Sequence, residues 1–275
     1  MQIAPLPQGF GAEITGFSLQ DDRSEADVAR LREAFDAHHL LIFRGEGTIT
    51  PDRQTEICGW FGPTGCDTGQ DGRSHTMMDN AEAIGRKALP FHSDITYMEF
   101  PIEGISLHPL DLPRSPTSTT FVSNACGWDA LSPELQDELH DALGQHYYAD
   151  SLTMDMDWPI FEYWHPVRME HPRTGRPLLF VTEHHVEQLS GVSDERSAQL
   201  LPILFDILYA PERRYEHFWQ SGDLLVWDNL AIQHARTREA DPSEGKRLLQ
   251  RVQIGAHGFL EQLEKVRRQA AEVTS

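Results

Sequence analysis

Two predicted strands near the end of the chain restrict its fold more than any other feature. Leu224 to Trp227 is a short apolar run that ends at the turn-forming pair Asp228 and Asn229, which is typical of a buried strand. His234 follows just past this turn. Residues Arg247 to Ile254 predict a second strand, and because side chains alternate across a strand, its two arginines lie on one face. Two arginines beside a histidine indicate a site for a carboxylate ligand held at a metal.

Other segments predict a mainly β protein with peripheral helices. Ser24, Thr50 and Ser193 are typical helix N-caps, and Pro202 should kink or break the helix that Ser193 begins. Further strands are expected at Leu40 to Phe43, Phe91 to Tyr97, Gly104 to Leu107 and Thr119 to Val122. No repeat or linker divides the chain, so we expect one β sandwich or barrel domain spanning residues 1–275.

Two segments carry weaker signals. Cys66 to Leu89 is polar, contains glycine and has no periodicity, so we expect a long loop there. The tail from Phe259 to Val273 places Leu260, Leu263 and Val266 near helical spacing. We expect this helix to pack on its own domain rather than to form a dimer contact.

The chain is strongly acidic, and this narrows the classes of partner. It has 23 basic and 43 acidic residues and a formal net charge of -20, so neither nucleic acid nor an anionic membrane is expected to bind. Three cysteines cannot form a disulfide framework, and no apolar stretch is long enough to span a membrane. We therefore expect a cytoplasmic protein that binds a small molecule, and the sequence leaves open whether it forms a homo-oligomer.

A histidine followed two residues later by an acid is a weak metal signal by itself. The chain contains two such triplets, His92-x-Asp94 and His185-x-Glu187. With 14 histidines and 43 acids among 275 residues, chance predicts roughly two (14 × 43/275). The spacing alone therefore does not identify a site, although alternate residues of a strand do point the same way.

The neighbours of the first triplet make it more specific. His234 follows Asp94 by 140 residues, and Arg247 follows His234 by thirteen. Two histidines and one carboxylate are the ligand set of non-haem iron oxygenases. A fixed guanidinium can then hold the remote carboxylate of a chelating 2-oxo acid. The alternatives are a hydrogen-bonded core histidine at 234 and, for the arginines, a surface ladder with acids.

Several motifs together resemble the taurine dioxygenase and 2,4-dichlorophenoxyacetate dioxygenase (TauD/TfdA) family, and they run through almost the whole chain. They are Gly11-Ala12-Glu13-Ile14-Thr15-Gly16-Phe17, Leu41-Ile42-Phe43-Arg44-Gly45, Phe61-Gly62-Pro63, Phe91-His92-Ser93-Asp94 with Thr96-Tyr97, His165-Pro166-Val167 with His171-Pro172, and Gly222-Asp223-Leu224 with Trp227-Asp228-Asn229. The resemblance implies a double-stranded β-helix (jelly-roll, cupin-like) core. It also implies an oxygenase that uses Fe(II), 2-oxoglutarate and O2 and releases succinate and CO2.

The resemblance also implies which residues carry the chemistry. His92, Asp94 and His234 would be the iron ligands and the catalytic centre. Asp94 fills the third protein position, where a small residue would leave room for a halide, so oxygenation or desaturation is expected rather than halogenation.

The same comparison by position implies a cosubstrate site. Arg247 would pair with the distal carboxylate of 2-oxoglutarate, helped by the hydroxyl of Thr119. Arg251 would lie nearer the metal and steady 2-oxoglutarate or a substrate anion.

The substrate is less constrained. An acid at Asp67, where the family's taurine enzymes bind a sulfonate, disfavours taurine and favours a small amine-bearing or zwitterionic acid. Ile95 and His185 would line the substrate pocket. We expect hydroxylation of a small carboxylate- or amine-bearing molecule. The alternatives are desaturation, cyclisation or rearrangement of a secondary-metabolite intermediate, and a non-catalytic protein that binds a metal or a small acid.

Overall fold

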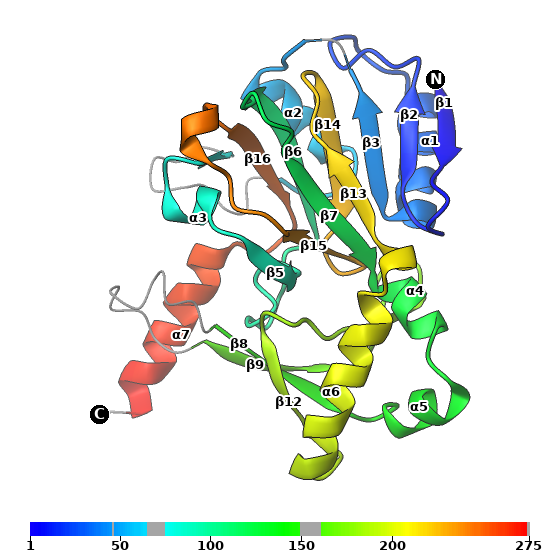
Figure 1. Cartoon of the computed structure of the whole chain (residues 1–275), viewed down its shortest axis with the longest axis vertical. Coiled ribbons are helices and arrows are strands. Elements are labelled where there is room, and N and C mark those ends of the chain that lie inside the picture. Colours follow the sequence, from blue (N-terminus) through cyan, green and yellow to red (C-terminus); the bar gives the residue numbers. More distant parts are fainter. Residues whose placement is uncertain (46, 65–74, 149–160, 274–275) are drawn as a thin grey trace.

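The computed structural model describes residues 1–45, 47–64, 75–148 and 161–273 (Figure 1). Its strands are β1 Gln2–Pro5, β2 Ala12–Thr15, β3 Leu40–Arg44, β4 Thr76–Asp79, β5 Leu89–His92, β6 Gly104–Asp111, β7 Ser118–Ser123, β8 Leu143–Tyr147, β9 Glu162–Pro166, β10 Arg168–Glu170, β11 Pro177–Leu179, β12 Val186–Leu189, β13 Tyr215–Phe218, β14 Asp223–Asp228, β15 Ile232–Arg236 and β16 Leu248–Ile254. Its helices are α1 Glu25–His38, α2 Pro51–Gly59, α3 Ala83–Arg86, α4 Asn124–Asp129, α5 Pro133–Glu138, α6 Asp194–Leu208 and α7 Phe259–Val273, with short 3-10 helices at Pro211–Arg213 and Pro242–Glu244.

Two sheets enclose the main core. The larger sheet has the strand order β1-β2-β3-β14-β6-β16-β4, and the smaller has the order β13-β7-β15-β5. Phe121 of β7 and Ile232 of β15 pack against Leu225 and Trp227 of β14, so side chains of the two sheets meet. This arrangement is the predicted jelly roll.

The four central residues of β14, Leu224 to Trp227, are all apolar because both faces of the strand are covered. Leu225 and Trp227 face the smaller sheet, whereas Leu224 and Val226 pack into the cluster that α1 and α2 form on the outer side. Figure 1 shows these helices behind the large sheet. An inner strand buried on both faces produces a continuous apolar run rather than an alternating one.

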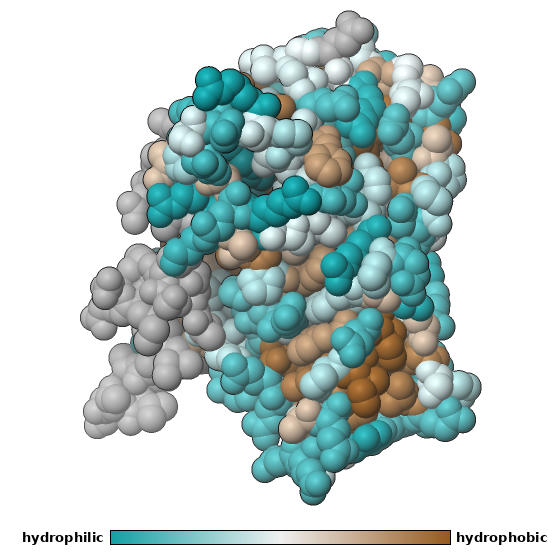
Figure 2. All heavy atoms as spheres, in the orientation of Figure 1, coloured by the Kyte–Doolittle hydropathy of each residue, from teal (hydrophilic) through white to brown (hydrophobic). Residues whose placement is uncertain are grey.

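The predicted helix starts are confirmed. The side chains of Ser24, Thr50 and Ser193 each accept a hydrogen bond from the backbone N–H three residues on. Pro202, however, does not break α6, which continues to Leu208. Several leucines of α6 are buried, so tertiary packing holds the helix through the lost backbone hydrogen bond. Figure 2 shows apolar side chains gathered around α6 on this face of the molecule.

The expected long loop from Cys66 to Leu89 is partly wrong. Residues 65–74 lie outside the described part of the chain, but Thr76–Asp79 forms β4 and Ala83–Arg86 forms α3. Strand β4 pairs antiparallel with β16, with Thr76 opposite Arg251. The partner strand lies far along the chain, so no local pattern reveals this edge strand.

The C-terminal helix packs on its own domain, as predicted. Leu263 is buried with Tyr97 and Phe161. Gln262 exchanges hydrogen bonds with the backbone N–H and C=O of Phe100 at 2.9 and 2.8 Å. Among the described residues, no helix is both long and apolar enough to cross a membrane.

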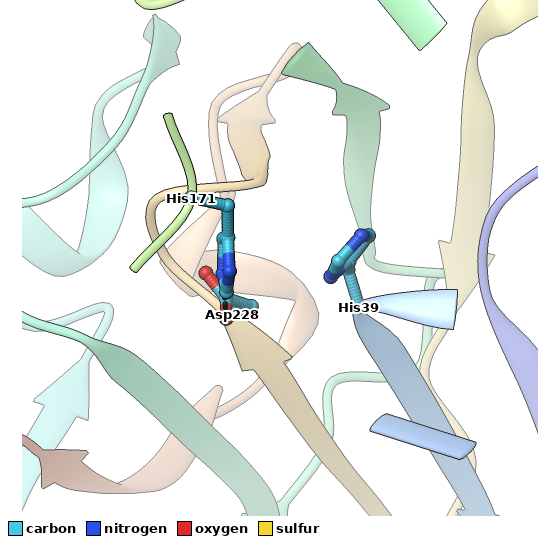
Figure 3. Close-up of side chains that lie close together, drawn as sticks. All are labelled: His39, His171 and Asp228. Carbon is cyan, nitrogen blue, oxygen red and sulfur yellow. Dashed lines mark hydrogen bonds and ion pairs between the residues drawn. The ribbon is translucent and has the colours of Figure 1, made fainter. Parts of the chain in front are cut away.

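A buried polar cluster joins three distant parts of the chain (Figure 3). His39 ends α1, His171 follows β10, and Asp228 ends β14. His171 Nε2 donates to Asp228 Oδ2 at 2.9 Å, whereas neither ring nitrogen of His39 has a hydrogen-bond partner among the described residues. Burial lowers the pKa of His39 to about 4, so this imidazole is neutral near pH 7.

This burial predicts acid-sensitive stability. A histidine whose pKa is 6.5 unfolded and about 4 folded binds its proton more readily in the unfolded chain, so its stabilising contribution is present above pH 6.5 and is lost as the pH falls toward 4. The free energy of unfolding of the wild type should fall between pH 7 and pH 5, and in His39→Asn this fall should be about 2 kcal/mol smaller. Urea unfolding at the two pH values measures the difference. Asparagine suits the left-handed backbone of residue 39, where φ is 62°.

Exposed His140 supplies the matched control, since His140→Asn should keep the wild-type pH dependence. An equal pH dependence in His39→Asn and wild type would show that His39 is not the group responsible.

Candidate active site

Three predicted metal ligands converge where β5 ends. His92 is the last residue of β5, His234 lies opposite it on β15, and Asp94 follows in the next turn. The Nε2 atoms of His92 and His234 lie 3.3 and 3.6 Å from Asp94 Oδ1. One ligand atom from each residue lies within 4.8 Å of the other two. The three side chains can therefore bind one ion.

The backbone that carries Asp94 differs from the prediction. The strand expected from Phe91 to Tyr97 ends at His92, and a turn follows. Ile95 has a φ of 60°, in the left-handed region that a β-branched residue rarely adopts. His92 and Asp94 therefore do not share one strand face; the turn instead bends the carboxylate back toward the imidazole.

Asn229 holds this turn in place. Its side-chain oxygen accepts from the N–H of Asp94 at 2.9 Å, and its side-chain nitrogen donates to the carbonyls of Asp94 and Ile102 at 3.0 and 2.9 Å. Asn229 is fully buried just after β14. One amide thus satisfies both backbone groups of Asp94, in a turn that has no strand partner to do so, and ties this turn to Ile102 in the segment before β6.

The protonation states suit a metal ion. His92 Nδ1 donates to the Pro90 carbonyl at 2.8 Å, which leaves the Nε2 lone pair facing Asp94. Burial, and then the charge of His92, lower the pKa of His234 to about 3. Burial opposes ionisation of Asp94, but the Arg251 guanidinium together with His92 and His234 outweighs it and keeps the pKa of this carboxyl well below its usual value. Two imidazole nitrogens and a carboxylate are a donor set that non-haem iron prefers.

The cluster of His39, His171 and Asp228 also places three potential ligands together, but it does not suit a metal. His171 Nδ1 accepts from two backbone N–H groups, and its Nε2 donates to Asp228. Asp228 accepts from His171, from Arg173 and from two backbone N–H groups. These lone pairs are already in use, and the Arg173 charge would repel a cation.

A cavity of about 250 Å³ extends from the three ligands into the space between the sheets. Arg247 lines it and is only 2% exposed. Its Nε donates to Thr117 Oγ1 at 3.0 Å, whereas its Nη1 has no hydrogen-bond partner among the described residues. No described carboxylate forms an ion pair with Arg247. A buried guanidinium that has no counterion among the described residues fits an anionic ligand.

The other two predicted cosubstrate residues line the same cavity. Thr119 is buried, and its hydroxyl accepts a hydrogen bond from Trp219 Nε1 at 3.1 Å. Arg251 lies closer to the ligands, where its Nη2 pairs with Asp94 Oδ2. Arg247 and Arg251 thus reach the cavity from one strand face, as the alternation along β16 predicts.

A second cavity, of about 170 Å³, opens beside His92 and Asp94. Two of the predicted substrate residues, Ile95 and His185, line it. The other described residues that line it are Leu89, Tyr97, Tyr148 and His184. Asp67, another predicted substrate residue, lies outside the described part of the chain. The other triplet, His185-x-Glu187, does not form a metal site among the described residues. Glu187 is exposed and belongs to neither of the two clusters whose side chains could hold a metal ion.

The sequence pattern alone missed two contributors. Arg236 lines the first cavity together with Arg247, and its place two residues after His234 on β15 could have revealed it. Trp219 donates a hydrogen bond to the Thr119 hydroxyl, and no sequence motif near Trp219 indicates this contact.

The chain is similar to several known proteins. The sequence model of the family described as "Taurine catabolism dioxygenase TauD, TfdA family" matches residues 2–253. A relative named (S)-phenoxypropionate/alpha-ketoglutarate-dioxygenase from Sphingobium herbicidovorans is 28% identical over 86% of this chain and 88% of its own. Pentalenolactone F synthase from Streptomyces arenae is 24% identical over 92% of this chain and 95% of its own. The crystal structure of a taurine dioxygenase from Burkholderia xenovorans superposes with a TM-score of 0.78 at 24% identity, covering 92% of this chain and 88% of that one.

The Asn229 contacts predict a loss of metal affinity on mutation. Asn229→Ala removes both hydrogen bonds to Asp94 and the one to Ile102, so the affinity for Mn(II) should fall about 10- to 100-fold in a calorimetric titration.

Gln54→Ala is the control for this experiment, because Gln54 is an equally buried amide whose partners, Ser106 and Gln250, lie away from the ligands. It should lose stability and keep its metal affinity. Unchanged Mn(II) binding by a folded Asn229→Ala protein would refute the positioning role.

Proposed function

The chain belongs to the taurine catabolism dioxygenase TauD, TfdA family, and we propose that it hydroxylates a small organic acid at a site built on His92, Asp94 and His234. It is an Fe(II)/2-oxoglutarate-dependent dioxygenase, as its family membership and its named relatives show. The observation that carries the residue assignment is the convergence of three ligand atoms within 4.8 Å, beside a cavity that contains the uncompensated Arg247.

His92, Asp94 and His234 would hold the ferrous ion through two imidazole nitrogens and one carboxylate. When bound, this ion supplies the redox chemistry that couples conversion of 2-oxoglutarate and O2 into succinate and CO2 to insertion of one oxygen atom into a substrate C–H bond. Three facial protein ligands leave room on the ion for small molecules.

The cavity residues would bind and orient 2-oxoglutarate. Arg247 would pair with the distal carboxylate, and the Thr119 hydroxyl, which accepts from Trp219, would donate its own proton to that carboxylate. Apolar side chains from both sheets exclude water from the space between: Met78, Leu89, Ile105, Leu107, Trp227 and Leu249. This dry lining strengthens the electrostatic attraction to the anion.

Arg251 would meet a substrate anion near the metal, because it reaches the ligand group and pairs with Asp94. The aromatic and imidazole side chains of the second cavity would then face the substrate body, with Ile95 and His185 as walls. The relative named for phenoxypropionate supports a small carboxylate substrate. The proposed preference for an amine-bearing or zwitterionic acid depends on Asp67.

A second outcome of the same chemistry has specific support. Two relatives are named pentalenolactone F synthase, at 24% and 25% identity, which favours desaturation, cyclisation or rearrangement of a secondary-metabolite intermediate as the alternative. Product mass separates hydroxylation, which adds one oxygen atom, from desaturation, which removes two hydrogen atoms. A non-catalytic role has no supporting observation, because the predicted ligand set is complete among the described residues.

We further propose that the chain acts as one domain, residues 1–275, on a diffusing small molecule in the cytoplasm. The net charge of -20 argues against nucleic acid or an anionic membrane as a partner. A homo-oligomer is compatible with this proposal.

A succinate-release screen tests the reaction and narrows the substrate. With Fe(II), 2-oxoglutarate and O2, at least one member of a panel of amino acids, sulfonates, aryloxy acids and amine-bearing carboxylates should raise succinate release above background. His234→Ala should abolish this release, because it removes one of the three ligands. Release that survives in His234→Ala but requires His185 would move the site to the other triplet, and no release with any substrate would favour the non-catalytic alternative.

Arg247→Met tests the cosubstrate site. The variant removes the buried charge while keeping a similar side-chain length, so the 2-oxoglutarate concentration needed for half-maximal turnover should rise about 10- to 100-fold. The concentration dependence on the organic substrate should change far less. An unaltered 2-oxoglutarate titration would contradict the assignment.

A further inference from the structure

The two strands that carry the histidine ligands pair irregularly with each other. Strand β5 lies at the edge of the smaller sheet and has β15 as its only neighbour there. Their pairing places His92 opposite His234, and a register shift separates this pair from the next one. A shifted ladder holds two strands less firmly than a regular one. The relative position of the two imidazoles therefore depends also on contacts from outside the sheet.

Tyr209 contacts both strands, in each case at the residue before the ligand. It follows α6, and its ring stacks on the ring of Phe91, with centroids 4.4 Å apart and planes 12° apart. Its hydroxyl donates to Oε1 of Gln233 at 2.7 Å. Successive side chains of a strand point to opposite faces, so Phe91 and Gln233 lie opposite the imidazoles of His92 and His234. One side chain thus joins the two ligand strands from behind the ligands.

The Gln233 amide is held on all sides. Besides accepting from Tyr209, it donates through Nε2 to Oδ1 of Asn124 at 2.6 Å and to the carbonyl of Val181 at 2.8 Å. Gln233 is fully buried, and Tyr209 is only 7% exposed. Burial raises the pKa of Tyr209 above its usual range, so the hydroxyl keeps its proton and can donate. A lost partner in such surroundings leaves the remaining group unsatisfied.

A second hydrogen bond fixes the direction of the Tyr209 hydroxyl. Its oxygen accepts from the backbone N–H of Glu183 at 3.0 Å. Glu183 begins the turn that leads to His184 and His185, which line the second cavity. The hydroxyl therefore also connects β15 to one wall of that cavity.

We propose that Tyr209 is a positioning residue of the metal centre, whose ring and hydroxyl together hold His92 and His234 at the separation that one ion requires. The inference rests on the proposed function, because it assumes that these histidines bind the ferrous ion. Tyr209 is absent from the described residues that line the two cavities, so it acts through Phe91 and Gln233 and not by touching a ligand.

A purely structural role of the hydroxyl predicts a different result. Tyr209→Phe leaves Gln233 Oε1 and the Glu183 N–H without a partner in buried surroundings, so the free energy of unfolding should fall in either case. If the hydroxyl only stabilised the fold, the folded variant would bind a metal with unchanged affinity and ligand geometry. A positioning role predicts that both change.

Metal titrations of the folded protein separate the two roles. Tyr209→Phe keeps the ring that stacks on Phe91 and removes only the hydroxyl, so the Kd for Mn(II) should rise about 10-fold. The visible absorption spectrum of the Co(II)-loaded variant should also differ from that of wild type, because these bands depend on how the ligand atoms surround the ion.

Tyr215→Phe is the matched control. The Tyr215 hydroxyl lies 3.4 Å from His217 Nδ1 on β13, which forms the opposite edge of the smaller sheet from β5. This variant also loses a tyrosine hydroxyl and should keep the wild-type Mn(II) affinity and Co(II) spectrum. Phe91→Leu tests the ring contact separately, since it removes the stacked ring and leaves the Tyr209 hydroxyl in place. It should raise the Kd for Mn(II) about 2- to 10-fold.

The remaining outcomes overturn the proposal. An unchanged Mn(II) affinity and Co(II) spectrum in folded Tyr209→Phe would assign the hydroxyl a purely structural role, and equal losses in Tyr209→Phe and Tyr215→Phe would indicate general destabilisation. Should Tyr209→Phe fail to fold, an unchanged Mn(II) affinity in Phe91→Leu would have the same meaning. All of these leave the proposed function intact. Wild-type protein that does not bind Mn(II), or His234→Ala protein that binds it as tightly as wild type, would instead refute the proposed site, and this inference with it.

Discussion

The candidate active site depends on one buried amide. Asn229 follows the most thoroughly buried strand of the large sheet, and its side chain bonds to three backbone groups around the turn that carries Asp94. That turn contains a left-handed isoleucine and lacks a strand partner, so its polar backbone groups need another source of hydrogen bonds. The rigid sheet thereby places a carboxylate that the edge strand β5 could not place by itself.

The residues next to Asn229 connect the same point to the rest of the molecule. Trp227 packs between the sheets and lines the cosubstrate cavity. Asp228 holds His171 and Arg173, and its backbone N–H donates to the carbonyl of His39. Three consecutive residues thus link the core, the N-terminal helix layer and the metal-ligand turn. A substitution at this strand end would disturb the packing or hydrogen bonding of all three regions, because buried polar groups have no water to replace a lost partner.

The cavity is lined by basic side chains, although the chain as a whole is strongly acidic. A protein of net charge -20 would repel a dicarboxylate over long distances, yet the described residues that line its cavity include Arg236, Arg247 and Arg251 and a single acid, Asp94. Burying the Arg247 guanidinium without a counterion among the described residues costs folding stability, which an anionic ligand would return on binding. Discrimination therefore arises at short range inside a dry cavity and not from the outer field, which solvent and salt screen.

The sequence by itself determined the mainly β class, the apolar strand β14, the helix caps and the shared face of Arg247 and Arg251, because these depend on local periodicity and hydrogen bonding. The jelly-roll core was implied by the family resemblance and not by periodicity. Only the tertiary structure decided that Thr76–Asp79 is an edge strand, that α6 continues through Pro202 and that Asp94 lies in a turn. It also decided that Arg236 joins the cavity. Each of these depends on a contact between residues distant in the chain. The free energy of such contacts outweighs local conformational preference, and it cannot be read from the order of residues along the chain.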